Sequence, residues 1–141
     1  MILSAREVTI AVGARVLCRG LNWQVAPGEL WGVLGCNGSG KTTLLHALAG
    51  LAPAAAGTIS LGERPLHDYS RRPRGRALGI LLQHEAEEFW GSVRDYVLLG
   101  RYPHARSLFG WQADDEAAAE QALAAFDLAA IAAQAYGTLS G

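Results

Sequence analysis

One glycine-rich stretch, "GVLGCNGSGKTTLLHALAG" at residues 32–50, constrains the fold more than any other part of the chain. An apolar run at residues 30–35 leads directly into it, as a buried parallel strand would. Leucines at helical spacing follow at residues 41–49, and Gly50 is placed to end that helix. A strand, a tight glycine turn and a helix in this order predict an α/β fold.

The residues between the strand and the helix fit the pattern G-x-x-x-x-G-K-[ST] in full. Glycines let the backbone turn tightly and bring its N–H groups close to a phosphate. The helix that begins near Lys41 directs the positive end of its dipole to the same place. Thr42 offers a small hydroxyl to Mg²⁺, which prefers hard oxygen ligands. The pattern therefore predicts a loop that binds the phosphates of a nucleotide, with these members: Gly35, Cys36, Asn37, Gly38, Ser39, Gly40, Lys41, Thr42 and Thr43.

Lys41 is the only lysine of the chain, in which every other Lys or Arg position is arginine. A compact ammonium on a flexible stem is able to lie along a curved loop and contact two phosphates as a point charge, whereas a planar guanidinium is too wide. This difference explains why lysine is retained at this position.

The remaining pattern divides the chain into two regions. Two short strands flank a tight turn at Gly13-Ala14. Residues 21–26 alternate apolar and polar as a further strand would, and residues 27–29 read as a turn. Further strands are expected at residues 57–61 and 78–82, the latter after a basic segment broken by proline. Beyond Gln83 the composition is helical. We expect residues 1–84 to form antiparallel strands plus a P-loop α/β core, and residues 85–141 to form a helical subdomain.

Composition excludes several classes of protein. Half of the 141 residues are hydrophobic, 18% are charged and the net charge is -1, which is typical of a soluble globular protein without a nucleic-acid partner. Arg6 and Glu7 interrupt the apolar stretch that a signal peptide needs, and two cysteines give neither a disulfide framework nor a metal pattern. The cytosol is the expected compartment. For the arginine cluster at residues 71–76, a solvated segment is favoured over nucleic-acid contact.

Motifs beyond the loop resemble the ATP-binding subunits of ABC transporters, and the resemblance covers essentially the whole chain. Pro27-Gly28-Glu29 stands ahead of the loop strand, "ILLQ" ending at Gln83 matches the Q-loop, and "TLSG" matches the first half of the LSGGQ signature through Leu139, Ser140 and Gly141. The stretch "FWGSVRDYVLLGRYPH" is most similar to importers of iron–siderophore, haem or cobalamin type. The resemblance implies a partial P-loop NTPase core and a chain that stops inside its signature.

The same resemblance implies a mechanism and partners. ATP and Mg²⁺ would be bound, with Lys41 and Gln83 catalytic and with Thr42 and Gln83 as metal ligands. A second ATP-binding subunit, in a homodimer, would place its signature against the loop, and hydrolysis would drive a transmembrane permease. The subunit would then be cytoplasmic and peripheral at the inner face of the membrane.

This sequence also departs from the family pattern. Ala11 and Val12 stand where the family has an aromatic residue that stacks on adenine, and Cys36 replaces the usual proline. The second half of the signature, the Walker B aspartate, the catalytic glutamate and the switch histidine are expected beyond Gly141. Three alternatives stay open: a nucleotide-binding fragment without turnover, a soluble ABC ATPase that is not part of a transporter, and a small P-loop kinase.

Overall fold

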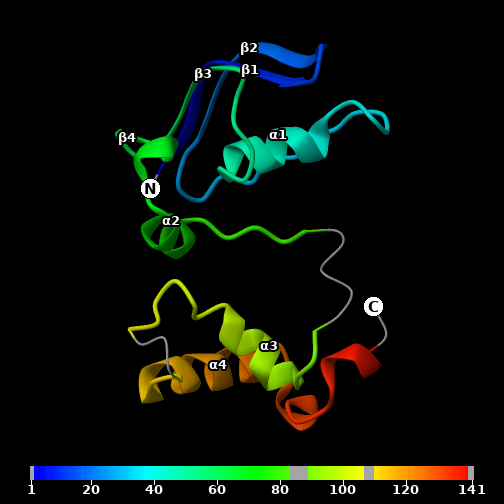
Figure 1. Ribbon diagram of the computed structural model, residues 1–141, viewed down its shortest axis with the longest axis vertical. Coiled ribbons are helices and arrows are strands. Elements are labelled where there is room, and N and C mark those ends of the chain that lie inside the picture. The colour runs from blue at the N-terminus through cyan, green and yellow to red at the C-terminus, as the bar shows by residue number, and fades with distance from the viewer. Residues whose placement is uncertain (1, 83–88, 107–109, 140–141) are drawn as a thin grey trace. The chain divides into compact units, whose positions relative to one another are not determined.

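The computed structural model describes residues 2–82, 89–106 and 110–139. The chain forms two compact units, Met1–Ser70 and Arg71–Gly141. The first contains an antiparallel sheet and one α-helix, and the second is built from helices (Figure 1). Within the described ranges, no helix combines the length and the apolar character needed to cross a membrane.

The sheet of the first unit has the strand order β2-β1-β3-β4, and every pair in it is antiparallel. β1 (Leu3–Val12) and β2 (Arg15–Val25) form the predicted hairpin. Its turn needs a glycine, because Gly13 has a φ of 57°. β3 (Ala56–Leu61) confirms the strand expected at residues 57–61, and the short β4 (Arg64–Pro65) completes the sheet.

A bulge in β1 brings its apolar side chains to one face. Ala5, Val8 and Ile10 are all buried, although two residues lie between the first two, where strict alternation of a strand allows one. The register of β1 shifts between Ala5 and Val8, and Glu7 has a φ of 50° there. Asn22 of β2 stabilises the bulge by accepting a hydrogen bond from the Glu7 backbone N–H at 3.0 Å. The extra residue thus directs Val8 into the core.

The helix after the glycine loop is confirmed as α1 (Lys41–Leu48). It packs against β1 and buries Ala47 and Leu48. Gly50 follows with a φ of 71°, a conformation suited to glycine at the end of a helix. The hydrophobic core of this unit therefore lies between α1 and one face of the sheet, with these buried members: Ala5, Val8, Ile10, Ala47, Leu48, Ile59, Leu61 and Leu66.

The second unit is centred on two packed helices, α3 (Val93–Leu99) and α4 (Ala113–Ala125). Their contact buries Val93, Leu98, Ala119 and Leu123. The chain then passes through the 3₁₀ turns η2 (Ala129–Ile131) and η3 (Tyr136–Thr138). Between them, the backbone carbonyl of Gln134 accepts a hydrogen bond from the Val93 N–H at 2.9 Å. Helices therefore form at segments beyond Gln83 that have helical composition, within the described residues.

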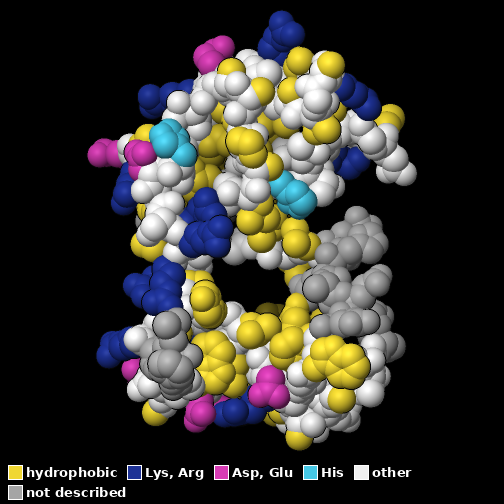
Figure 2. All heavy atoms as spheres, viewed as in Figure 1, with side chains coloured by type: hydrophobic (Ala, Val, Ile, Leu, Met, Phe, Trp, Pro, Cys, Tyr) yellow, Lys and Arg dark blue, Asp and Glu magenta, His cyan; other side chains and the backbone are white. Residues whose placement is uncertain are grey.

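Two predicted strands are absent from the structure. Residues 30–35 and 78–82 have no regular secondary structure and pair with no strand in the described part of the chain. Leu30, Leu34 and Leu81 are 100%, 94% and 89% exposed. An apolar run becomes a buried strand only where neighbouring strands satisfy its backbone and cover its faces, and these segments have no such neighbours. Hydrophobic surface is visible on the face shown in Figure 2.

One further expectation needs correction. The basic segment is helical, as α2 (Arg71–Ala77), because Pro73 lies in the first turn, where its missing N–H is not needed.

Trp31, within the first irregular segment, is exposed, and its ring meets the half-buried Trp23 edge to face at 5.6 Å.

Candidate functional site

The glycine loop is held in a tight turn immediately before α1. The Ser39 N–H donates to the Cys36 carbonyl at 3.2 Å, and Gly38 and Gly40 have φ values of 76° and 98°. A side chain at Gly35 would lie 2.8 Å from the Ser39 hydroxyl oxygen. The loop therefore requires glycine both for its backbone conformation and for its close approaches.

Lys41 folds back over this loop. Its Nζ donates to the carbonyl oxygens of Gly35 at 2.8 Å and Cys36 at 2.9 Å. An ammonium has three donors, so one remains for a ligand held by the loop. These two hydrogen bonds hold the positive charge of Lys41 beside the loop.

The start of α1 faces the same loop. Gly40 is the N-cap residue, and in the described structure no side chain caps this end of the helix. The N–H groups of the first turn and the helix dipole therefore provide a site that favours an anion. Thr42, in this turn, is exposed. Its hydroxyl is an oxygen donor of the kind that Mg²⁺ prefers.

The donor set near the loop fits Mg²⁺ only together with phosphate oxygens. No group of three or more His, Cys, Asp or Glu side chains able to hold a metal occurs among the described residues. Mg²⁺ bound to nucleotides in proteins normally keeps several waters and takes one or two protein ligands plus phosphate oxygens. A single threonine hydroxyl beside the loop is compatible with that mode of binding.

The hairpin supports the loop from the other side. Arg15, the first residue of β2, donates from Nη2 to the Gly38 carbonyl at 3.4 Å, and Leu17 approaches Gly40 so closely that an added Cβ would lie 2.9 Å from Leu17 Cδ1. Sequence reasoning missed both supporting residues. Nothing in their spacing marks them, because they reach the loop only through the fold of the hairpin.

The turn before the loop is fixed by Glu29. Its carboxylate accepts hydrogen bonds from Trp31 Nε1 and from the Ala26 N–H, both at 2.9 Å. These two bonds, the Trp31 bond more than the Ala26 bond, lower the pKa of Glu29 from its ordinary value. Glu29 therefore stays ionised at neutral pH and holds the predicted turn at residues 27–29.

The predicted loop members from Gly35 to Thr43 lie together in the turn before α1 and in its first residues. Gln83, Ser140 and Gly141 lie outside the described residues. Leu139 is described and follows η3. Val12, in the position expected for an aromatic, is 59% exposed at the end of β1.

Comparisons with known proteins agree with the loop geometry. Residues 18–141 match the family described as ABC transporter. The hemin import ATP-binding protein HmuV of Gloeobacter violaceus is 37% identical over 139 residues, which are 99% of this chain and 50% of that protein. Its namesake in Pseudomonas aeruginosa is 39% identical over 139 residues, 99% of this chain and 53% of that protein.

A solved structure agrees as well. It is described as an inward-facing conformation of a metal-chelate type ABC transporter, and it superimposes with a TM-score of 0.78 at 30% identity over 98% of this chain and 49% of that chain. The chain spans about half the length of the curated relatives that it matches. The family match covers far more than half of the sequence, and it includes the glycine loop described above. This chain therefore belongs to the ABC transporter family.

Proposed function

We propose that this chain is the ATP-binding part of an ABC importer subunit and binds Mg-ATP through residues 35–43. The observation that carries the proposal is the loop itself: Lys41 Nζ is held by the Gly35 and Cys36 carbonyls beside an uncapped helix start. This arrangement gathers one full positive charge, backbone N–H groups and a helix dipole at one point. A polyphosphate is the ligand that needs all three.

Each residue of the loop has a role in this proposal. The backbone N–H groups and Lys41 hold the β- and γ-phosphates and neutralise charge as the terminal phosphate is transferred to water. Thr42 and Gln83 are the proposed protein ligands of Mg²⁺, which supplies additional positive charge on the phosphates. Gln83 also positions the attacking water. It is neutral and has both a donor and an acceptor, so it does not compete for the proton of the water.

Hydrolysis is proposed for a dimer. The segment at Leu139, Ser140 and Gly141 belongs to a signature that would face the loop of a second ATP-binding subunit, a homodimer being favoured. In the proposed organisation, residues 1–84 hold the nucleotide and residues 85–141 form the helical subdomain. The names of the relatives, which are hemin import ATP-binding proteins, support haem or another metal chelate as cargo. A transmembrane permease would be the partner at the cytoplasmic face of the membrane.

Calorimetric titration with ATP in the presence of Mg²⁺ tests the nucleotide-binding step. Wild-type protein should bind, and Lys41→Ala should bind much more weakly. Arg19→Ala, an exposed arginine of β2 outside the loop, is the matched control and should bind as the wild type does. Equal ATP affinity in wild type and Lys41→Ala would refute the proposal.

The transport step needs a separate experiment. We expect the full-length subunit to co-purify from membranes with a permease, and its ATP hydrolysis to rise when that complex is reconstituted in vesicles. A full-length product that hydrolyses ATP but associates with no membrane protein would favour the soluble, non-transport alternative.

A further inference from the structure

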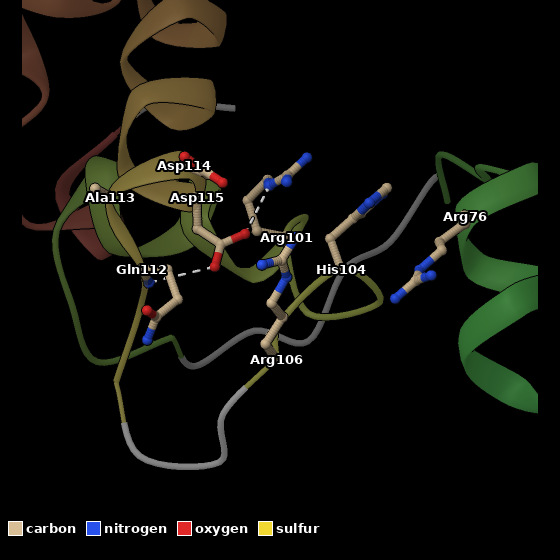
Figure 3. Close-up of a pocket in the computed structure, with 8 residues that line it drawn as sticks. All are labelled: Arg76, Arg101, His104, Arg106, Gln112, Ala113, Asp114 and Asp115. Carbon is tan, nitrogen blue, oxygen red and sulfur yellow. Dashed lines mark hydrogen bonds and ion pairs between the residues drawn. The ribbon is translucent and has the colours of Figure 1, made fainter.

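The second unit contains a polar cavity that the nucleotide site does not use. It has a volume of about 380 Å³ and lies between α2, the turn that follows α3 and the start of α4. Figure 3 shows its charged lining. We name it the arginine pocket, and its charged or titratable members are Arg76, Arg101, His104, Arg106, Asp114 and Asp115.

Positive charge is concentrated around this pocket. Of the 12 Lys and Arg residues of the chain, four lie in α2 and two, Arg101 and Arg106, in the turn after α3. Contacts hold these two segments together. The Arg72 guanidinium lies 5.6 Å from the centre of the Tyr102 ring, and Arg76 Nε donates to the Pro103 carbonyl at 2.8 Å. The fold thus gathers like charges that would repel each other less if they were spread over the surface.

The carboxylates of the pocket offset only part of this charge. Asp115 is buried, and its oxygens accept bonds from Arg101 Nε at 3.1 Å and from the Gln112 N–H at 3.3 Å. Asp115 therefore already forms an ion pair with Arg101 and takes part in the N-terminal cap of α4. Asp114 is exposed. Within the described parts of the chain, neither Arg76 nor Arg106 forms an ion pair.

The remaining donors come from two segments that line the pocket, and both Arg76 and Arg106 are exposed. Arg76 uses Nε for the Pro103 carbonyl, which leaves its two Nη groups available. In Figure 3 its guanidinium extends from α2 toward the turn that carries His104, and Arg106 extends from that turn toward the Arg101–Asp115 pair. Guanidinium groups match the oxygens of phosphate in two-point contacts. A phosphate group presents enough oxygens to accept from several donors at once, whereas a carboxylate has only two.

We propose that the arginine pocket binds a phosphate group, as inorganic phosphate or a phosphate monoester, at a site separate from the nucleotide loop. Arg76 and Arg106 are its principal ligands. The ion pair between Arg101 and Asp115 lines the same pocket beside Arg106. The site does not rest on the proposed nucleotide function, because no member of the loop contributes to it.

The test must first remove phosphate binding at the loop. Calorimetric titration with inorganic phosphate is therefore carried out on Lys41→Ala protein. In that background, Arg76→Ala and Arg106→Ala should each weaken phosphate binding about tenfold, the effect of losing a hydrogen bond to a charged group. Arg19→Ala, an exposed arginine of the first unit, is the matched control and should leave the affinity unchanged. Arg106→Lys keeps the positive charge but lacks the two-point geometry of a guanidinium, and it should give an intermediate affinity for phosphate.

Competing ligands define the class of anion. Acetate at the same concentration should bind at least tenfold more weakly than phosphate, in line with charge-assisted two-point contacts. Vesicles of phosphatidylcholine with phosphatidic acid test whether the bound phosphate belongs to a lipid. If the protein binds these vesicles and loses that binding in Arg76→Ala and Arg106→Ala, the phosphate is that of a lipid headgroup.

Three results would overturn the proposal. They are the absence of both phosphate and vesicle binding in Lys41→Ala, equal binding in the pocket variants and in Arg19→Ala, and equal affinity for acetate and phosphate. Binding of an acidic peptide without phosphate or vesicle binding would likewise replace the phosphate site with a protein-docking surface. Unfolding midpoints within error of the Lys41→Ala background establish that a lost affinity is not a lost fold.

Discussion

Lys41 uses two of its three donors on its own loop, at the carbonyls of Gly35 and Cys36. At the scale of single residues, this arrangement decides what the position accepts. The stem must curve back over the turn, and the terminal group must fit between two carbonyl oxygens and a phosphate. A guanidinium is planar and spreads its donors over a wider fork, so it cannot occupy the same space.

Substitution of Lys41 separates its charge from its shape. Lys41→Ala removes the charge, and Lys41→Arg keeps the charge but not the compact ammonium. We expect both to weaken ATP binding by about tenfold or more, since a hydrogen bond to a charged group contributes about 1.5–3 kcal/mol. Isothermal titration measures this, and wild-type affinity in Lys41→Arg would show that charge alone is sufficient.

Val12 carries the second prediction at this scale. It is exposed at the end of β1, where the family pattern has an aromatic. In the proposed function, the adenine would therefore lack a stacking contact of about 1–3 kcal/mol. The wild type should therefore discriminate poorly between ATP and GTP. Val12→Tyr, or Ala11→Tyr, should tighten ATP binding. Competition binding with both nucleotides is the measurement, and a strong ATP preference in the wild type would mean that another side chain supplies the stack.

At the scale of elements, the sequence predicts those strands and helices that depend on interactions between residues close together in the chain. The hairpin follows from a glycine turn between alternating segments, and α1 follows from leucine spacing that ends at Gly50. The bulge at Glu7 was not predictable, because it depends on Asn22 in the opposite strand. Residues 30–35 and 78–82 have the composition of buried strands but lack paired neighbours, and sequence composition does not reveal whether a neighbour is present.

Gly57 is restricted both by its own backbone conformation and by a close contact with the neighbouring strand β1. It has a φ of 81°, and an added Cβ would lie 2.3 Å from the Glu7 carbonyl oxygen in β1. Gly57→Ala should therefore destabilise the first unit by more than the approximately 1–3 kcal/mol of backbone strain alone. Gly13→Ala is the matched control, because Gly13 also has a positive φ but has no atom within 4 Å of the added Cβ. Urea unfolding gives both values, and equal losses would contradict the close contact.

The capping box of α3 gives a pH-dependent prediction. The Ser92 hydroxyl, and secondarily the Ser92 backbone N–H, lowers the pKa of Asp95 below its ordinary value of 3.8. Because the folded pKa is the lower one, the ionised carboxylate stabilises α3 above pH 3.8, and this contribution is lost as the pH falls through the folded pKa. Ser92→Ala should cost about 1 kcal/mol at neutral pH and less in acid. Chemical unfolding at both pH values tests this, and a pH-independent cost would exclude Asp95 as the partner.

At the scale of the whole molecule, phosphate binding and hydrolysis make different demands on the chain. In the proposed function, the loop, Lys41 and Thr42 hold the phosphates. Hydrolysis also needs a carboxylate that acts on the attacking water together with Gln83, and charge stabilisation from an opposing subunit. Among the described residues, no carboxylate forms a hydrogen bond or ion pair with residues 35–43. Exposed apolar segments such as residues 30–34 also favour self-association.

We therefore expect residues 1–141 by themselves to bind ATP without hydrolysing it at a useful rate. The physical reason is that a phosphate cradle stabilises the nucleotide, while turnover requires groups that act on the attacking water. Steady-state phosphate release is measured on protein shown by light scattering to be free of aggregates, with Lys41→Ala as the control for contaminating ATPases. Turnover of about 1 per second, the low end of ordinary enzyme rates, that disappears in Lys41→Ala would show that these residues contain a complete hydrolytic site. Phosphate release that persists unchanged in Lys41→Ala would come from a contaminant and would leave the expected result, binding without turnover, in place.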